Sequence, residues 1–380
     1  MKILHLIFSE QIAGAEKYLL DLLPGLKDEG FDCHLLCVCP PGAQHKFAGY
    51  CDELNSKGVK ATLITSKVSG FLSVAGKINR YLKENEISYL HSHLFKSDLL
   101  AVIVKKLFNK KILLISTKHG YQEKYLSTYP VHKGKIIRNA YYYIAKYLCR
   151  NINEQLTVSK VMSDIYFNLK ITPQRIKYIY HGINLSSLPV VADTTPYRIG
   201  SPQLIIVGRL EEVKGHQYLF EAMPAVTKKY PDVKLLVLGD GVLKQKLIDK
   251  VAVAGMEKNI LFLGFQQDPY SYMAQSDIIV LPSMFESFGL VYIESFALKV
   301  PVIGFDAPAC NEIITNNETG ILVPMFNSAA LAEKIIYLLQ DPAERKRLGE
   351  NGYAKYTGYY NTVRMIRETA DWYRSVLQVE

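Results

Sequence analysis

The segment ESFGLVYIE begins at Glu286, ends at Glu294 and directly follows an apolar, strand-like run. Gly289 allows close approach of the backbone, and Ser287 is a residue type that caps helices, so we expect a helix to begin near Phe288. The amide groups at a helix N-terminus bind anions such as phosphate. A carboxylate does not face a phosphate favourably, so we expect Glu286 to point at hydroxyl groups.

The spacing of the two glutamates leaves two interpretations open. They are eight residues apart, which is roughly 12 Å along the axis if the segment is wholly helical. That length is about the distance from a sugar to a ribose across a diphosphate. The alternative is a capping carboxylate and an unrelated surface glutamate, and spacing alone does not separate the two.

Two cations follow the strand-like run QLIIV. Arg209 lies just after the run, and Lys214 precedes Gly215 and a helix-like stretch. A guanidinium fork and an ammonium point charge together suit a diphosphate leaving group. The alternative is a pair of solvated surface cations.

The first half of the chain holds two further candidates. His119 follows the run KILLIS and could donate a hydrogen bond to a sugar hydroxyl or a phosphate, although a structural histidine is the alternative. Gly14 is the one glycine in the first loop, SEQIAGAEKYL, which therefore lacks the G-x-G-x-x-G dinucleotide fingerprint. The single glycine is still compatible with a tight loop beside a ligand.

No metal centre is predicted. His91 and His93 lie two residues apart at a strand end, but the sequence indicates no third ligand and contains no DxD cluster. The absence of G-x4-G-K-[ST] and G-x-S-x-G motifs disfavours P-loop and hydrolase chemistry.

Short apolar runs alternate with amphipathic stretches along the whole chain, which is typical of parallel sheets covered by helices on both faces. The runs are 2–8, 33–39, 61–66, 88–93, 111–117, 155–159 and 176–180, and then 203–208, 233–239, 259–264, 277–283, 300–305 and 319–324. Residues 185–202 interrupt the rhythm and are rich in Pro, Ser and Thr, as in a linker. We therefore expect an α/β protein with two doubly wound domains, at 1–188 and 200–360. Ligands of such sheets bind beyond the carboxyl ends of the strands, where the candidate residues stand.

Composition is that of an ordinary globular protein, with 49% hydrophobic and 21% charged residues. No apolar run approaches the roughly 20 residues that a membrane span needs, and the start, MKILHLIF, is read as a strand rather than a signal peptide. Cys37 and Cys39 alternate within an apolar run and no CxxC pair occurs, so we expect reduced thiols in a cytoplasmic protein.

The net charge of +9 is unevenly placed. Residues 1–190 hold 26 Lys and Arg against 14 Asp and Glu, whereas residues 191–380 hold 19 against 22. A basic first half suggests an anionic partner there, for which anionic lipid, an acidic acceptor and nucleic acid all fit. A solvated basic surface without a partner is the alternative.

Several ordered motifs resemble the GT-B glycosyltransferases of family 4, which are retaining enzymes that use nucleotide-diphosphate sugars. The motifs are GRL-x3-KG, ESFGLVYIE, HGIN (181–184), VPVIG (300–304) and NETGILVP (317–324). The resemblance covers nearly the whole chain. It implies two Rossmann-like domains, an N-terminal one for the acceptor and a C-terminal one for the nucleotide sugar, with a last helix, about 361–380, that crosses back onto the first. It also implies that the nucleotide sugar, a UDP- or GDP-sugar, is a substrate and that no cofactor is needed.

The resemblance also implies a role for each candidate residue. By this resemblance, Arg209 and Lys214 bind the diphosphate, Glu286 binds the donor sugar, and Glu294 binds the ribose hydroxyls. Phe288, Gly289 and Leu290 form the turn that meets sugar and phosphate. His119 contacts the transferred sugar, and Gly14 lies in the loop under the phosphates. Three positions depart from the family pattern: Ala13 and Lys299 stand where glycine is usual, and His181 stands where asparagine is usual.

The predicted function is therefore metal-independent hexosyl transfer with retention, to a glycan or lipid-linked acceptor, in bacterial cell-surface polysaccharide or glycolipid synthesis. The stretches 106–111 and 131–150 mix basic and aromatic residues, which suits peripheral attachment to the anionic inner face of a membrane, unless the tyrosines pack inward. The first alternative is a GT-B epimerase or phosphorylase. A basic nucleic-acid-binding protein is the second, and the acidic second half and the lack of a binding motif speak against it.

Overall fold

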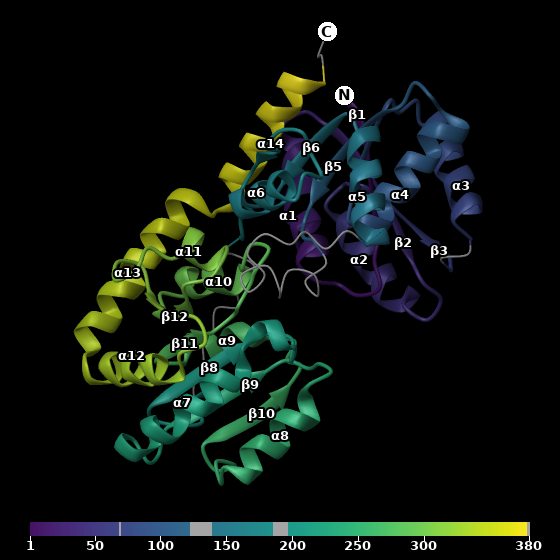
Figure 1. Cartoon of the computed structure of the whole chain (residues 1–380). Helices are drawn as coiled ribbons and strands as arrows, with labels where there is room; N and C mark the ends of the chain where they lie inside the picture. Colours follow the sequence, from purple (N-terminus) through teal and green to yellow (C-terminus); the bar gives the residue numbers. More distant parts are fainter. Residues whose placement is uncertain (68–69, 122–138, 185–196, 378–380) are drawn as a thin grey trace. The chain divides into compact units, whose positions relative to one another are not determined.

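The computed structural model of the chain describes residues 1–67, 70–121, 139–184 and 197–377 (Figure 1). These residues form two compact units, each with its own parallel sheet. Unit 1 takes the described residues up to 182 together with 362–377, and unit 2 takes those from 183 to 361. The predicted α/β class with two doubly wound sheets is confirmed.

The sheet of unit 1 has the strand order β3-β2-β1-β4-β5-β6-β7, and every pair in it is parallel. Its strands are β1 (Lys2–Phe8), β2 (Asp32–Cys39), β3 (Lys60–Thr65), β4 (Tyr89–His93), β5 (Leu113–Lys118), β6 (Glu154–Thr157) and β7 (Lys177–Tyr178). The order runs outward from β1 in both directions, so the chain changes direction between β1 and β4. That point is where open sheets of this kind bind ligands.

Helices cover both faces of this sheet, as Figure 1 shows. They are α1 (Gly14–Asp28), α2 (Gln44–Ser56), α3 (Phe71–Glu84), α4 (Phe95–Ile103) with a π-helical continuation over Val104–Phe108, α5 (Ala140–Asn151), α6 (Lys160–Asn168) and α14 (Thr362–Val376). Successive side chains of a strand point to opposite faces. Ile3 and Ile7 of β1 therefore pack with α1, α2 and α14, whereas Leu4 and Leu6 pack with α3 and α4.

The last helix, α14, belongs to unit 1. It packs against α1, and its Tyr373 is fully buried in the core of that unit. Arg374 Nη2 lies 2.8 Å from Glu29 Oε2, at the end of α1. Unit 1 is thus assembled from both ends of the chain.

The sheet of unit 2 has the order β10-β9-β8-β11-β12-β13, again parallel throughout. Its strands are β8 (Gln203–Val207), β9 (Lys234–Leu238), β10 (Ile260–Gly264), β11 (Ile278–Leu281), β12 (Val302–Phe305) and β13 (Ile321–Val323). Its helices are α7 (His216–Lys229), α8 (Lys244–Val253), α9 (Pro269–Ala274), α10 (Leu290–Ala297), α11 (Cys310–Ile313), α12 (Ser328–Gln340) and α13 (Pro342–Tyr359).

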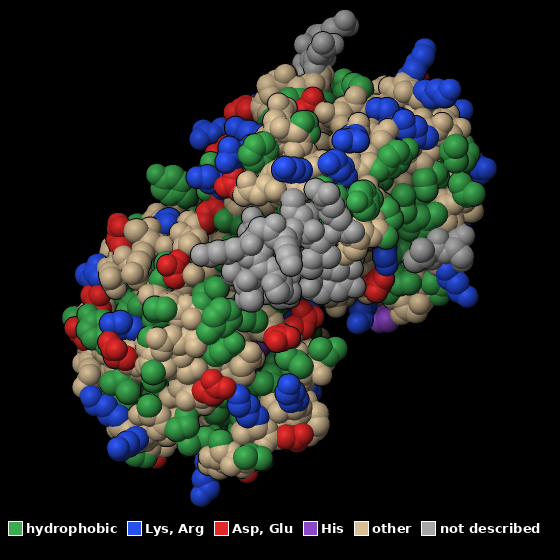
Figure 2. Space-filling model, viewed as in Figure 1, with side chains coloured by type: hydrophobic (Ala, Val, Ile, Leu, Met, Phe, Trp, Pro, Cys, Tyr) green, Lys and Arg blue, Asp and Glu red, His purple; other side chains and the backbone are tan. Residues whose placement is uncertain are grey.

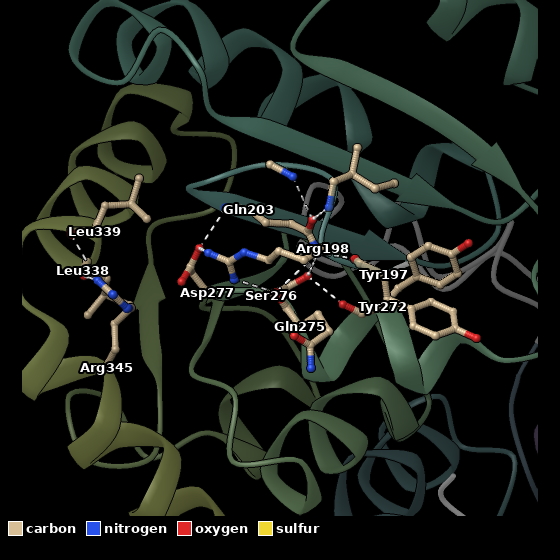
Figure 3. Close-up of polar contacts among 12 residues, drawn as sticks. Tyr197, Arg198, Gln203, Tyr272, Gln275, Ser276, Asp277, Leu338, Leu339 and Arg345 are labelled. Carbon is tan, nitrogen blue, oxygen red and sulfur yellow. Dashed lines mark hydrogen bonds and ion pairs between the residues drawn. The ribbon is translucent and has the colours of Figure 1, made fainter. Parts of the chain in front are cut away.

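A polar network holds the amino end of this sheet (Figure 3). Gln203 is fully buried, accepts a hydrogen bond from the Ile199 amide (2.7 Å) and donates one to the Tyr197 carbonyl (3.0 Å). Asp277 accepts from the Gln203 amide and from Arg198 Nη2, both at 2.8 Å. This network lies at the opposite end of the strands from the candidate site. It holds residues 197–199, which lead into β8, against Gln203 and Asp277.

Each predicted apolar run forms a strand, with shifts of a few residues at the ends. The stretch 106–111 is helical only as far as Phe108, because the π-helix ends there. The residues 131–138 and 185–196, which carry part of the predicted basic stretch and of the predicted linker, lie outside the described part. All six cysteines are buried and none forms a disulfide. Among the described residues, we find no helix with the length and hydropathy needed to cross a bilayer.

Candidate active site

In unit 2, the segments that follow three neighbouring strands are joined by backbone hydrogen bonds. The Met284 amide, after β11, donates to the Val213 carbonyl, after β8, at 2.8 Å. The Glu286 amide donates to the Pro308 carbonyl, after β12, at 3.4 Å. The carboxyl ends of β8, β11 and β12 therefore carry one connected group of loops.

Gly215 lets the first of these loops turn tightly. Its φ is +69°, and a Cβ added there would lie 2.0 Å from the Pro282 carbonyl oxygen. No other residue fits this position without a backbone shift. The turn brings Lys214 to the loop that follows β11.

Lys214 and Glu286 form a bidentate ion pair there. Lys214 Nζ lies 2.7 Å from Oε1 and 2.8 Å from Oε2 of Glu286. The side chains are only 16% and 14% exposed, so solvent screens this pair less than a surface pair. The sequence predicted both residues in one site, but it did not predict that they contact each other.

Arg209 follows β8 and is about half exposed, and its Nη1 lies 2.8 Å from Glu211 Oε1. Glu211 was not among the predicted site residues, although it lies only two residues beyond Arg209. The guanidinium stands at the carboxyl edge of the sheet, where the prediction placed a diphosphate contact.

The predicted cap by Ser287 is wrong. Helix α10 begins at Leu290, its N-cap is Gly289, and no side chain caps it. Gly289 has φ +93°, which is a left-handed conformation that serine adopts poorly, and a Cβ there would lie 2.7 Å from the Tyr292 ring. Phe288 is buried, with its ring centroid 6.0 Å from that of Tyr360.

Glu294 lies on α10 and is 7% exposed. The Tyr270 hydroxyl donates to its Oε1 at 3.1 Å. Tyr270 lies in the first turn of α9 and was not among the predicted site residues. The 12 Å estimate for the two glutamates does not apply, because the helix starts only at Leu290.

In unit 1, His119 follows β5 and is partly buried. Its ring meets the Tyr18 ring of α1 edge-on, with centroids 4.9 Å apart. Gly14 is the first residue of α1, and the preceding Ala13 amide donates to Glu16 Oε2 at 2.8 Å. Burial lowers the pKa of His119 to about 3, so its imidazole is neutral at pH 7.

Beside His119 lies a group of three buried histidines. His91 and His93 had no predicted third partner, and the structure supplies one in His5, so that one ring nitrogen of each lies within 4.8 Å of the others. Proximity alone would allow a metal ion. However, His91 Nε2 is 2.8 Å from Thr117 Oγ1, its Nδ1 bonds the Tyr373 hydroxyl, and His93 Nε2 is 3.0 Å from His5 Nδ1. Hydrogen bonds thus occupy these nitrogens.

The opposite face of the same sheet carries a buried charge pair. Lys118 Nζ lies 2.6 Å from Asp98 Oδ2, and both side chains are about 5% exposed or less. Asp98 Oδ1 also accepts hydrogen bonds from the hydroxyls of Ser92 and Ser116, each at 2.6 Å. This network ties α4 to β4 and β5 directly below the loop that carries His119.

Two of the three departures from the family pattern have structural counterparts. Lys299 adopts φ +59°, which explains why glycine is usual there, and its Nζ pairs with Glu350 at 3.1 Å. His181 is buried against Tyr18, with ring centroids 5.1 Å apart, and burial lowers its pKa to about 3. Neither residue takes part in the Lys214–Glu286 or Arg209–Glu211 ion pair.

Comparison with known proteins matches both units. Residues 12–187 match the model described as Glycosyltransferase Family 4, and residues 196–355 match Glycosyl transferases group 1. An uncharacterised glycosyltransferase of Methanocaldococcus jannaschii is 30% identical over 287 residues, which is 74% of each chain. A Campylobacter jejuni enzyme, N-acetylgalactosamine-N,N'-diacetylbacillosaminyl-diphospho-undecaprenol 4-alpha-N-acetylgalactosaminyltransferase, is 31% identical over 186 residues, 49% of this chain and 50% of that one.

The alignments span about half the length of the first curated relatives that the chain matches. Among solved structures, that of Anabaena HepE in complex with UDP and glucose has a TM-score of 0.81 and 20% sequence identity, covering 99% of this chain and 100% of that one. This likeness shows a shared fold.

Proposed function

This chain belongs to the glycosyltransferases of group 1 and family 4, and from that premise we propose that it moves a hexosyl group from a nucleotide-diphosphate sugar to a glycan or lipid-linked acceptor. The observation that carries the proposal is the Lys214–Glu286 pair, because it places a cation and a carboxylate at the carboxyl edge of the unit 2 sheet, just before helix α10. The cation would bind the diphosphate, and the carboxylate would accept a hydrogen bond from a sugar hydroxyl.

The chemistry follows from where charge develops. When the bond from the anomeric carbon to the phosphate oxygen breaks, the diphosphate gains negative charge and the sugar gains positive charge. Arg209, Lys214 and the first amides of α10 would stabilise the leaving group electrostatically. Glu286 would accept a hydrogen bond from a sugar hydroxyl, and Glu294 would hold the ribose hydroxyls together with Tyr270.

We further propose that the transfer retains the anomeric configuration and needs no metal ion. The acceptor would attack from the face that the diphosphate leaves, and the leaving phosphate would take the acceptor's proton. In this scheme Arg209 and Lys214 supply the positive charge. In unit 1, His119 would contact the transferred sugar, and Gly14 would let the backbone approach the phosphates.

A screen of donors tests the substrate class. UDP-, GDP- and ADP-sugars are each added to the full chain, and we expect one base to raise the unfolding midpoint by several degrees, since a ligand at 100 times its Kd stabilises the folded state by about 2.7 kcal/mol. UDP is our first expectation because the Anabaena HepE structures contain UDP and UDP-glucose. The midpoint is measured by calorimetry or dye fluorescence. No shift with any nucleotide sugar would contradict the proposal.

The acceptor is proposed to be lipid-linked, with the enzyme on the cytoplasmic face of a membrane, in the synthesis of a bacterial cell-surface polysaccharide or glycolipid. The name of the Campylobacter jejuni relative specifies a diphospho-undecaprenol acceptor. In unit 1, the π-helix exposes the apolar side chains of Leu107 and Phe108, and α5 exposes those of Tyr143, Ile144 and Tyr147. Figure 2 shows lysine and arginine side chains interspersed with apolar ones on the visible face of this unit. Such a surface suits an anionic lipid headgroup region.

Vesicle binding tests this surface. We expect the full chain to co-sediment with vesicles that contain anionic lipid, and less so at high salt, because the attraction is screened. The double variant Phe108→Ser, Tyr147→Ser should lower the bound fraction about tenfold, since it removes two apolar anchors. The matched control is Val242→Ser, Val253→Ser, which changes two exposed apolar residues of unit 2. Binding that ignores both lipid charge and the first variant would contradict membrane docking.

A further inference from the structure

Three imidazoles of unit 1 form a hydrogen-bonded row that ends at His119. His5 Nδ1 lies 3.0 Å from His93 Nε2, and His93 Nδ1 lies 3.1 Å from His119 Nε2. His5 and His93 are fully buried, whereas His119 is partly exposed where β5 ends. The row therefore leads from the middle of the sheet to its carboxyl edge.

All three rings are neutral at pH 7. Burial lowers the pKa of His5 and of His119 to about 3, and it holds the pKa of His93 well below the ordinary value. A neutral imidazole has one N–H donor and one acceptor nitrogen. Each contact of the row therefore holds one proton, supplied by one of the two rings.

The contacts couple the tautomers of the three rings. Each contact joins Nδ1 of one ring to Nε2 of the next. If one ring carries its proton on Nδ1, both hydrogen bonds form only when the other two rings do the same, and the same holds for Nε2. A mixed row would place two lone pairs or two N–H groups against each other in a buried site, which is unfavourable because neither group then has a hydrogen-bond partner.

The inner end of the row is closed. His5 Nε2 is buried and has no hydrogen-bond partner among the described residues. Protons therefore cannot pass through this end, and the row cannot invert by handing protons along its length. The outer end is Nδ1 of His119, which is a donor in one state of the row and an acceptor in the other.

We propose that His93 and His5 are positioning residues that keep His119 in a single tautomer, the same as their own, so that His119 Nδ1 meets a sugar hydroxyl in one fixed hydrogen-bonding role. The contact with sugar rests on the proposed function, whereas the shared tautomer does not. His91 stands apart from the row, because its two nitrogens bond Thr117 and Tyr373.

Nuclear magnetic resonance of the full chain tests the shared tautomer without any substrate. Long-range proton–nitrogen spectra of protein labelled with 15N-histidine distinguish a protonated Nδ1 from a protonated Nε2 in each ring. Single substitutions assign the nine histidines. We expect His5, His93 and His119 to be neutral and to show the same tautomer. Different tautomers among the three, or an imidazolium in the row at pH 7, would overturn the proposal.

Variants test whether the buried ring controls the outer one. His93→Phe keeps an aromatic ring but removes the partner of His119 Nε2, so His119 should become a mixture of tautomers. His93→Asn keeps a hydrogen-bonding group near the position of Nδ1, so it should bring the His119 spectrum back toward that of the parent. His34→Phe is the matched control, because His34 is an equally buried histidine of the same sheet that bonds Tyr81 outside the row. An unchanged His119 spectrum in His93→Phe would sink the idea.

Activity gives the second readout. We expect His93→Phe to lower kcat for sugar transfer about tenfold with a smaller change in KM, and His93→Asn to recover most of that loss. His34→Phe should leave both constants near those of the parent. If no nucleotide sugar is a substrate, the proposed function fails while the tautomer spectra still decide the positioning. Should His93→Phe not fold, the spectra of the parent chain alone support or overturn the shared tautomer.

Discussion

Replacing Lys214 with alanine is expected to lower kcat/KM for sugar transfer by about 10²- to 10³-fold. The ammonium stands at the carboxyl edge of the unit 2 sheet, where the leaving diphosphate gains negative charge, and charge stabilisation of this kind commonly has that magnitude. The ion pair with Glu286 is mostly buried, so little water is available to replace the lost charge. Initial rates with the nucleotide sugar that stabilises the chain give the measurement.

Glu286→Gln should be comparably inactive, since it keeps the size of the side chain but removes the carboxylate expected to bind the donor sugar. The double variant Lys214→Met, Glu286→Gln removes both charges at once, so it leaves neither partner as a lone buried charge. It should fold well and stay inactive. That outcome separates loss of chemistry from loss of stability.

The control for these variants is another ion pair of unit 2. Lys250 Nζ lies 2.6 Å from Glu221 Oε1, but both side chains are nearly half exposed. Lys250→Ala should leave kcat/KM within about twofold of the parent, because exposed pairs contribute little. Full activity in both Lys214→Ala and Glu286→Gln would refute the assignment of the donor site.

The second large effect concerns stability. Asp98→Ala is expected to lower the free energy of unfolding by about 3–5 kcal/mol, because it leaves Lys118 as an uncompensated buried charge. It also takes away the acceptor shared by the hydroxyls of Ser92 and Ser116. Urea unfolding followed by circular dichroism measures the change.

Asp164→Ala provides the comparison. Its carboxylate pairs with Arg175 Nε at 2.6 Å, but the arginine side chain is 64% exposed, so the loss should stay within about 1 kcal/mol. If Asp98→Ala proves no more destabilising than Asp164→Ala, the buried pair does not hold β4, β5 and α4 together as argued. Because α4 packs under the strand that presents His119, we also expect Asp98→Ala to weaken catalysis.

The strands were predictable because parallel strands buried on both faces appear as short apolar runs. The candidate site residues could be chosen for a related reason: most of them follow such a run, and ligands of these sheets bind at strand ends. The contact between Lys214 and Glu286 was not predictable, since it depends on β8 lying beside β11. No local signal in the sequence specifies that neighbour.

The histidine row also depends on which strands lie side by side, so it could not be predicted from the sequence. His5 meets His93 only because β1 pairs with β4 in a register that sets His5 opposite His91. The predicted helix start near Phe288 was wrong for a local reason. Ser287 has the better capping chemistry, but the N-cap position needs a left-handed backbone conformation, which Gly289 adopts. Chemistry of single residues was thus easier to predict than the partners they find.

The split course of unit 1 has a consequence for how the protein is made. Helix α14 packs on α1 and brings Tyr373 to His91, so this unit can complete its core only after α14 has been synthesised. The described residues of unit 2 all lie between 183 and 361, so they are synthesised before α14. Domains usually fold in the order in which the ribosome releases them. In this protein, unit 1 begins first but keeps the face of its sheet that α14 covers incomplete until the residues of unit 2 have also been synthesised.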